Sequence, residues 1–306
     1  MVPEEPETPT PLERVLQKIR ANADDITKYV EAGEGAAIIV RADITEGEAE
    51  YEVRYDLASA VMVPLQSLEN PRYQVGFSLR DKQTGAELED RFQWIINTDD
   101  AGLLLSFDDD YMHVWENNFD RFDRYGARIT FFVQGSHSSF CAKAQSRGHD
   151  IGYHTMHHLN LPLVSPEAFF RETVSELERF RNDGVPLRAF AYPFGLSEPW
   201  MLEALSGTFA VQRGYGVSFH LYTIDTITGG YIRSRAIDNI LFKTDEDFEA
   251  LITIMLRTAK FTGGILPLTT HDISDTADWG IKPQRLDYLL KTAQDLGLKF
   301  YRYSDF

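Results

Sequence analysis

The sequence predicts an α/β protein in which a (β/α) barrel follows a smaller β-rich domain that begins with a helix. Up to about residue 98, short alternating apolar runs are separated by turn formers, whereas later strand-like runs alternate with helical ones, as in a largely parallel sheet. The length of 306 residues suits one large domain or two of unequal size. We expect a flexible linker over 1–10, the helix and β-rich domain over 11–98, and the barrel domain over 99–306.

The first ten residues, MVPEEPETPT, are rich in Pro, Glu and Thr. Such residues bury little apolar area, which favours an extended and mobile linker. The stretch has neither a basic start nor an apolar segment, so it is not a signal peptide as written. Because linkers of this kind often follow a cleaved export signal or lipid anchor, we expect an extracytoplasmic protein, whether periplasmic, cell-surface or secreted.

The β-rich domain is expected to begin with an amphipathic helix. From Pro11 to about Ala32 apolar residues fall near helical spacing, which predicts one helix or a helix broken near Asn22. From Ala36 to about Ile96 the pattern changes to short strand-like runs, with turn formers such as Glu46-Gly47 between them. The runs are AAIIV, EYEVRY, AVMVPL, YQVGFSL and FQWII.

The barrel domain is expected to alternate strands with helices. The strand candidates are Gly102 to Phe107, Ala127 to Val133, Asp150 to His154, Leu187 to Tyr192, Gly264 to Thr270 and Lys299 to Tyr303. The helix candidates are Tyr111 to Arg124, Pro166 to Arg181, Pro199 to Leu205, Asp245 to Lys260 and Pro283 to Leu296.

Polar residues follow several of these strands directly. Asp108 and Asp109 follow LLLSF, His154 follows DIGY, and His271 follows ILPLTT. In a β/α barrel the carboxyl ends of the strands form one mouth. Separate segments are therefore expected to bring carboxylates and imidazoles to one place, as a barrel active site requires.

Composition excludes some classes of partner. The formal charge of −17 argues against nucleic acid and anionic lipid, which attract Lys and Arg, whereas neutral or cationic glycans remain compatible. No apolar run approaches the roughly 20 residues that span a bilayer, so no membrane span is expected. Cys141 is the only cysteine, so no internal disulfide can form.

His154 and His158, in HTMHH, are four residues apart. On a helical turn their rings would lie on one face, within reach of one ion, and Asp109 or its neighbour would complete three ligands. Three protein ligands with an open position suit a hydrolytic metal, and a mixed His and carboxylate set suits zinc. By itself the pair also fits two exposed or capping imidazoles, and the SFDDD run also fits an acidic helix N-terminus.

Several segments, in chain order, resemble motifs of the polysaccharide deacetylases of carbohydrate esterase family 4, which share the nodulation-deacetylase homology domain. LLLSFDDD resembles the first motif (Thr-Phe-Asp-Asp-Gly), GARITFFVQG the second strand, and RGHDIGYHTMHHLNL the His-(Ser/Thr)-x-x-x-His zone. RAFAYPFG looks like a variant third motif, and LTTHD looks like the closing Leu-x-x-His. The resemblance covers about residues 100 to 306 and implies a distorted (β/α) barrel.

By matching position, the resemblance implies a role for each polar residue. Asp108 would be the general base, and Asp109 would bind the metal together with His154 and His158. His271 would be the general acid. The implied cofactor is a divalent metal, with zinc expected from the ligand set.

The resemblance also implies how the substrate would be held. Leu268 would line the pocket for the acetyl methyl group, and the backbone N–H of Phe194 would face the developing oxyanion. Tyr153 and Trp279 are the better candidates for a sugar platform because each lies near a proposed catalytic segment, although such aromatics are more often core residues.

Two family features lack a direct counterpart. The arginine that tethers the base is replaced by Ala191, and the Asp-Trp motif has no clear match before His271. Arg188, Arg233 or Arg235 could supply the missing cation. We favour Arg235, although each also fits a surface or strand-edge arginine.

The resemblance implies a metal-dependent hydrolase that removes N-acetyl groups from N-acetylglucosamine-containing polysaccharide, with an acetylated glycan as partner. The alternatives are an O-acetyl xylan esterase or another amidase on the same scaffold, or a catalytically decayed glycan-binding protein. Ala191 and the missing tryptophan motif favour decay, whereas retention of the aspartates and of the three histidines weighs against it. The sequence specifies neither the exact glycan nor an oligomeric state.

Overall fold

The computed structural model describes residues 8–21, 27–32, 38–63, 72–95 and 99–306. It divides into two compact units, Met1–Thr98 and Asp99–Phe306. Most of the expected N-terminal linker, residues 1–7, lies outside the described residues. Among the described residues, no helix combines the length and the apolar character needed to cross a membrane.

The first unit contains helix α1 and a five-stranded antiparallel sheet in the order β1-β2-β3-β4-β5. The elements are α1 Pro11–Ala21, β1 Thr27–Ala32, β2 Ile38–Glu46, β3 Ala49–Val63, β4 Arg72–Asp81 and β5 Glu87–Ile95. Val15 and Ile19, one helical turn apart, are fully buried on α1, as are Val53 and Val75 in the sheet. A helix therefore covers one face of this sheet.

Two details of this unit differ from the prediction. The expected helix ends at Ala21, and Thr27–Ala32 is strand β1, paired antiparallel with β2. The segment TKYVEA is rich in β-branched and aromatic residues, which favour a strand beside an available partner. The described part of the run AVMVPL, residues 60–63, is not a separate strand but extends β3, whose pairing with β4 shifts register between Asp56 and Val61.

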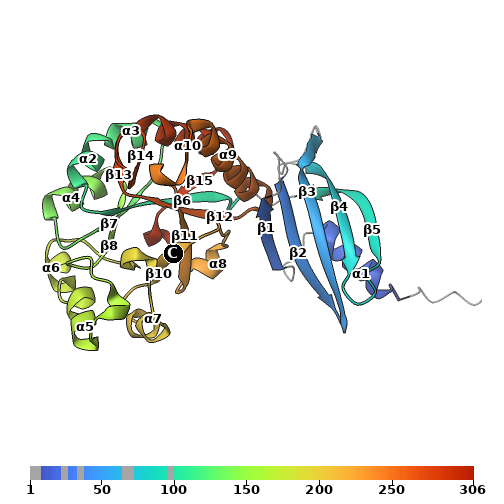
Figure 1. Cartoon of the computed structure of the whole chain (residues 1–306), viewed down its shortest axis with the longest axis horizontal. Coiled ribbons are helices and arrows are strands. Elements are labelled where there is room, and N and C mark those ends of the chain that lie inside the picture. The colour runs from blue at the N-terminus through green and yellow to red at the C-terminus, as the bar shows by residue number, and fades with distance from the viewer. Residues whose placement is uncertain (1–7, 22–26, 33–37, 64–71, 96–98) are drawn as a thin grey trace, which may run out of the picture. The chain divides into compact units, whose positions relative to one another are not determined.

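The second unit is a closed barrel of seven parallel strands surrounded by helices (Figure 1). Its strands are β6 Gly102–Asp109, β7 Thr130–Val133, β8 Asp150–Tyr153, β9 Ala189–Ala191, β10 Val211–Gly216, β11 Tyr231–Ala236 and β12 Ile265–Thr270. Pairing of β12 with β6 closes the barrel. On the other edge of β6, β15 (Lys299–Tyr301) pairs with its first residues and β7 with its last.

The helices lie on the outside of the barrel (Figure 1). They are α2 Met112–Asn117, α3 Phe119–Arg124, α4 Ser138–Ser146, α5 Pro166–Val174, α6 Leu177–Asn182, α7 Pro199–Leu205, α8 Ile224–Ile227, α9 Asp245–Thr262 and α10 Pro283–Asp295. A small parallel pair, β13 (Asp272–Ile273) and β14 (Gly280–Ile281), follows β12. Thr244 caps α9 by accepting a hydrogen bond from Asp247 N–H, and Gly263 ends it with φ 68°.

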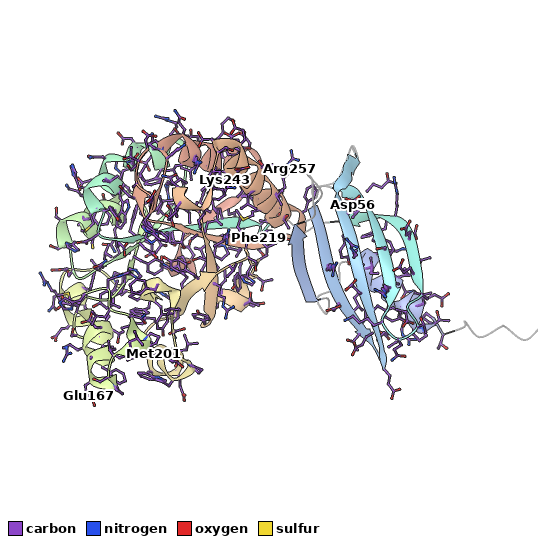
Figure 2. All side chains as sticks on the ribbon, in the orientation of Figure 1. Asp56, Glu167, Met201, Phe219, Lys243 and Arg257 are labelled. Atoms are coloured by element: carbon purple, nitrogen blue, oxygen red, sulfur yellow. The ribbon has the colours of Figure 1, made fainter. Side chains whose placement is uncertain are left out.

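Successive residues of each barrel strand face opposite sides of the wall. Leu103, Leu105 and Phe107 of β6 belong to a core between the strands and the helices, which also contains Met201 of α7 (Figure 2). Leu104 belongs instead to a separate core with Phe132, Ala191, Val211 and Tyr303. This second core fills the barrel, so Ser106 and Asp108 on β6 face the interior.

The fold class is confirmed, and so are most predicted elements of the barrel. Strands β10, β11, β13 and β14 and helices α4 and α8 were not predicted. The expected helices 111–124 and 166–181 are each two helices, broken near Asn118 and Ser175. Strands β10 and β11 matter most among these, because β10 and the segment just after β11 contribute side chains to the site.

Candidate metal and catalytic site

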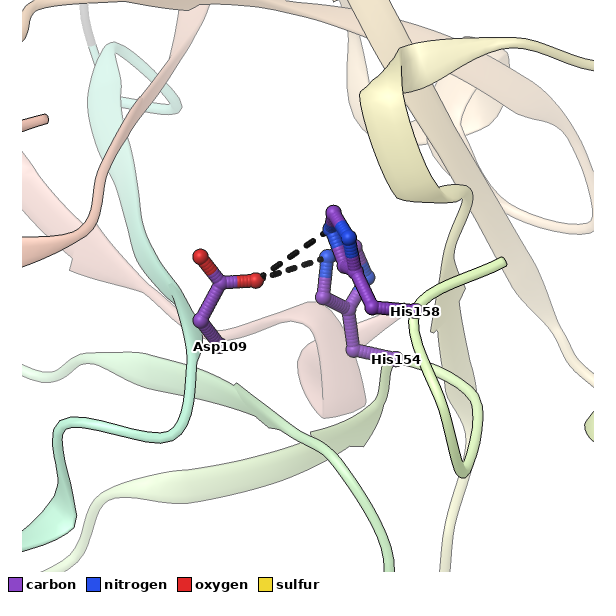
Figure 3. Close-up of side chains that lie close together, drawn as sticks. All are labelled: Asp109, His154 and His158. Atoms are coloured by element: carbon purple, nitrogen blue, oxygen red, sulfur yellow. Dashed lines mark ion pairs between the residues drawn. The ribbon is translucent and has the colours of Figure 1, made fainter. Parts of the chain in front are cut away.

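Asp109, His154 and His158 converge on one point at the carboxyl end of the barrel (Figure 3). Oδ1 of Asp109 lies 3.4 Å from Nε2 of His154 and 3.3 Å from Nε2 of His158. All three candidate ligand atoms lie within 4.8 Å of one another. Two imidazole nitrogens and one carboxylate oxygen at this separation fit a divalent ion with room for further ligands.

The first histidine is prepared for coordination through its second nitrogen. His154 is 1% exposed, and its Nδ1 lies 2.8 Å from the carbonyl oxygen of Ala191. A carbonyl can only accept, so Nδ1 carries a proton, and Nε2, which faces Asp109 and His158, is the nitrogen available to a metal. Metal-binding histidines are commonly oriented in this way by a backbone carbonyl. The donor set therefore fits a metal on the chemistry of its own contacts.

The spacing of His154 and His158 suggested a helical turn, but the segment that carries them is not helical. Thr155 and His158 have positive φ values of 66° and 51°, and so do Asp109 (79°) and Phe194 (59°). These four are all the non-glycine residues with positive φ that the described ranges contain. Such conformations cost on the order of 1 kcal/mol each. Their concentration here indicates that the site, not local preference, determines this backbone.

Asp108 is fully buried and is held by a buried arginine. Nη2 of Arg213 lies 2.5 Å from both carboxylate oxygens, and the hydroxyl of Tyr215 donates to Oδ2 at 2.6 Å. Arg213 is also fully buried, with its guanidinium 5.1 Å from the ring centroid of Phe132 and 4.7 Å from that of Tyr215. The chain therefore supplies a tether for the proposed base, in spite of Ala191.

The prediction that Arg235 supplies this cation is wrong. Alternation along β11 places Ile232 and Ser234 inside the barrel and Arg233 and Arg235 on its outer side. Arg235 donates to the carbonyl of Val217 instead. The other candidate, Arg188, donates to the backbone oxygen of Phe306 at 3.4 Å.

The two aspartates both favour the charged form. Burial alone would raise the pKa of Asp108, but the positive charge of Arg213, with smaller effects from His154 and His271, lowers it below its ordinary value. Burial opposes ionisation of Asp109 as well, but the hydrogen bond and charge of His154 lower its pKa to about 2. Both carboxylates are therefore ionised at neutral pH.

His271 lies beside this pair and is oriented by a second buried aspartate. Its Nδ1 is 3.0 Å from Oδ1 of Asp238, which also accepts a hydrogen bond from Thr270 at 2.8 Å. Trp115 donates to the backbone oxygen of His271 at 2.8 Å. Burial alone would lower the pKa of His271, but Asp238 raises it to about 9. The imidazole is therefore protonated at neutral pH and can act as an acid.

Two expected substrate-binding residues do not line the site. Tyr153 is fully buried, packs against Phe180 and Phe190, and donates to the backbone oxygen of Glu172. Leu268 is fully buried in the outer core, because it faces the helices while Thr269 faces the barrel interior. Both predictions are therefore corrected by strand alternation.

Two aromatic side chains do border the site. Phe194 is 53% exposed and its ring centroid lies 4.6 Å from that of His158. Trp279 is 56% exposed and its ring centroid lies 5.9 Å from that of His271. A sugar ring could stack on either exposed face. The role expected for the backbone N–H of Phe194 stays a prediction.

Sequence reasoning missed three residues of this arrangement, Arg213, Tyr215 and Asp238. The first two are two residues apart in VQRGYG, a strand that its glycines and polar residues conceal. Asp238 comes just after β11, at the same barrel end as Asp108 and His271. Had β11 been predicted, Asp238 would have been recognised as a polar residue that follows the carboxyl end of a barrel strand, and so as a candidate partner of His271.

Comparison with protein-family models gives the same family as the sequence motifs. The family model described as polysaccharide deacetylase matches residues 96–207. That range contains Asp108, Asp109, His154 and His158. No curated protein matches the sequence.

Solved structures of similar folds come from several deacetylases and esterases. A peptidoglycan deacetylase from Bacillus subtilis has a TM-score of 0.47 and 16% identity, covering 69% of this chain and 91% of that one. The Xyl-CE4 domain of a multidomain xylanase from the hindgut metagenome of Trinervitermes trinervoides gives 0.49 and 18%, covering 66% and 87%. The chitin deacetylase of Colletotrichum lindemuthianum gives 0.49 and 15%, covering 67% and 86%.

The resemblance drawn from the motifs is thereby confirmed by the family match, which includes the first motif and the histidine zone. Residues 96–207 of this chain are therefore similar in sequence to a polysaccharide deacetylase domain.

Proposed function

We propose that the barrel domain is a metal-dependent hydrolase that removes N-acetyl groups from N-acetylglucosamine-containing polysaccharide. One observation carries the proposal: the three candidate metal ligands share a barrel mouth with the tethered Asp108 and with His271. Amide hydrolysis requires a strong nucleophile, stabilisation of an oxyanion and a proton for nitrogen. The mouth offers a group for each requirement.

Asp109, His154 and His158 would hold the metal, and the nitrogen and oxygen donors favour zinc. When bound, a divalent cation lowers the pKa of coordinated water and polarises a carbonyl. The orientation of His154 by the carbonyl of Ala191 supports this assignment, because it leaves Nε2 free to coordinate.

Asp108 would act as general base, accepting one proton as water oxygen bonds to the acetyl carbon. Arg213 and Tyr215 hold the carboxylate in place, and the charge of Arg213 keeps it ionised before the reaction. The tetrahedral carbon then loses its bond to nitrogen, and that nitrogen takes a proton from His271. The products are acetate and a free amine on the sugar.

The domain match and the charge of the chain support the proposed substrate class. The strongly acidic chain favours a neutral or cationic glycan over an anionic polymer. Peptidoglycan, chitin-like oligomers and poly-N-acetylglucosamine are the proposed substrates. Because such polymers lie outside the cytoplasm, the proposal includes an extracytoplasmic place of action.

Acetate release tests the proposal. The protein is incubated with N-acetylated glycans and with O-acetylated xylan, before and after removal of metal by a chelator and after addition of zinc. We expect acetate from an N-acetylated glycan, loss of activity with the chelator, and recovery with zinc. Activity on xylan alone would replace the proposal with an O-acetyl esterase, and no acetate from any substrate would favour a decayed, glycan-binding site.

Metal content provides a second test. His154→Ala removes a candidate ligand and is expected to abolish stoichiometric zinc binding. His113→Ala is the matched control. His113 is an exposed histidine that contacts Asn117 and is not one of the three candidate metal ligands. Full zinc occupancy in His154→Ala would refute the ligand set.

A further inference from the structure

Tyr215 connects the proposed base to the proposed acid. Its hydroxyl donates to Oδ2 of Asp108 at 2.6 Å, and its oxygen lies 3.3 Å from Nε2 of His271. We propose that Tyr215 is a positioning residue, whose hydroxyl oxygen holds the Nε2 proton of His271 on the side of the base until the leaving nitrogen takes that proton. The inference rests on the proposed function and assigns a role to a residue that the deacetylase motifs do not include.

The direction of each hydrogen bond follows from the atoms available. The carboxylate of Asp108 can only accept, so the single hydroxyl proton of Tyr215 points to it. The Tyr215 oxygen can then only accept from His271, which places a proton on Nε2. Asp238 likewise accepts from Nδ1 of the same ring. Both ring nitrogens are thus held as donors, and Nε2 is the one on the side of the base.

The tyrosine ring has little freedom to move. One face is covered by the guanidinium of Arg213, 4.7 Å from the ring centroid. On another side, a Cβ added to Gly195 would lie 2.5 Å from both the ring carbon Cδ2 and the backbone nitrogen of Tyr215. Gly195 also has φ 68°, so glycine suits this position for two reasons. The hydroxyl is therefore fixed before substrate arrives, as an effective positioning group requires.

A proton held in this way matters for one step only. When the tetrahedral carbon collapses, the C–N bond breaks and its electron pair becomes the N–H bond formed with the Nε2 proton of His271. An amine needs that proton to leave. The phenolate released from an activated aryl acetate leaves without it. Loss of the Tyr215 hydroxyl should therefore slow amide cleavage far more than aryl ester cleavage.

The experiment compares Tyr215→Phe with the wild type on an N-acetylated glycan oligomer and on 4-nitrophenyl acetate. We expect kcat for the amide to fall about 10²-fold, the lower range for a positioned acid, with KM unchanged. For the aryl ester we expect a change of less than about threefold, because its leaving group needs no acid. Zinc affinity, measured by competition with a chromogenic chelator, should remain that of the wild type.

Tyr192→Phe is the matched control. Tyr192 is fully buried, whereas Tyr215 is half-buried, and the Tyr192 hydroxyl likewise donates at 2.6 Å, but to Gln212 on the outer side of the barrel. Its removal should affect both substrates equally and only slightly.

The outcomes separate this inference from the proposed function. A wild type that cleaves neither substrate ends both proposals. A wild type that cleaves both, with Tyr215→Phe slowed equally on amide and ester or not slowed at all, leaves the function standing and overturns the role of Tyr215. A loss of zinc affinity in Tyr215→Phe would also overturn it, since the residue would then support the metal site.

Discussion

The two halves of the site are built by different means. The metal side, Asp109, His154 and His158, depends on strained backbone, since two of its three residues have positive φ. The proton side comprises Asp108, Arg213, Tyr215, Asp238 and His271. None of these five has positive φ, and Arg213 and Tyr215 follow the simple alternation of strand β10.

Burial differs in the same sense. Asp108, Arg213 and Asp238 are fully buried and Tyr215 is half-buried, whereas on the metal side only His154 is buried and Asp109 and His158 are partly exposed. A metal ligand must meet an ion that enters from solvent, while an acid–base pair works best shielded from water. The comparison teaches that one mouth can combine metal ligands on strained backbone with a largely buried polar network, and we expect that each half can be altered separately.

The largest expected effect separates the two halves by activity. Asp108→Asn keeps the size of the side chain but removes the proton acceptor, so turnover should fall on the order of 10³-fold. Zinc stoichiometry should stay unchanged, because the metal side is intact. Steady-state kinetics and metal analysis measure the two quantities. Wild-type turnover would remove Asp108 as base, and loss of zinc would show that the halves are not separable.

The next effect concerns the stability of the proton side. Arg213→Met leaves the Asp108 carboxylate buried without its cation, which should reduce the free energy of unfolding by about 3–5 kcal/mol. Arg235→Met is the control and should change it by less than about 1 kcal/mol, since Arg235 lies outside the barrel interior. Urea unfolding of both variants measures the difference. Equal losses would contradict the assignment of Arg213 as the tether.

A smaller effect should appear as a pH dependence of stability. The pKa of His271 is raised to about 9, above its ordinary value, so its protonated form is stabilised in the folded state. Its contribution is fully present below about pH 6.5 and is lost as pH rises through about 9. Metal-free wild type should therefore lose on the order of 1–3 kcal/mol over that interval.

His271→Asn should lack this component of the pH dependence, since asparagine does not titrate. Denaturant unfolding at pH 6.5, 7.5 and 9 gives the comparison. A wild type and a variant with parallel pH profiles would show that Asp238 does not stabilise the imidazolium.

The smallest expected effect tests backbone strain on the metal side. His158→Gly places glycine at φ 51°, where it is relaxed, so metal-free stability should stay the same or rise by up to about 1 kcal/mol. His154→Gly should instead destabilise the protein. His154 is buried and hydrogen-bonded to the carbonyl of Ala191, and its φ is not positive, so glycine relieves no strain there. Thermal unfolding of the metal-free variants distinguishes the two. A large loss in His158→Gly would show that its backbone is not strained.

Much of the site could be predicted because its residues follow obvious strands. LLLSF and ILPLTT are buried apolar runs that were predicted as strands. Asp108 and His271 follow them directly and were therefore predicted as site residues. VQRGYG offered no such run, so the strand and its inward Arg213 went unrecognised. Arg235 was favoured in its place because, without the alternation of β11, nothing distinguished an inward from an outward arginine.

The sequence by itself determined the class of fold, the order of the motifs and the identity of the candidate metal ligands, since these depend on local apolar patterns and on several motifs that resemble one family in chain order. Only the tertiary structure decided which arginine and which aspartate serve the proton side, and that Tyr153 and Leu268 belong to the core. The reason is that the direction of a side chain depends on strand register and barrel closure. Register and closure are set by pairing between segments distant in the sequence, so they cannot be predicted from one strand alone.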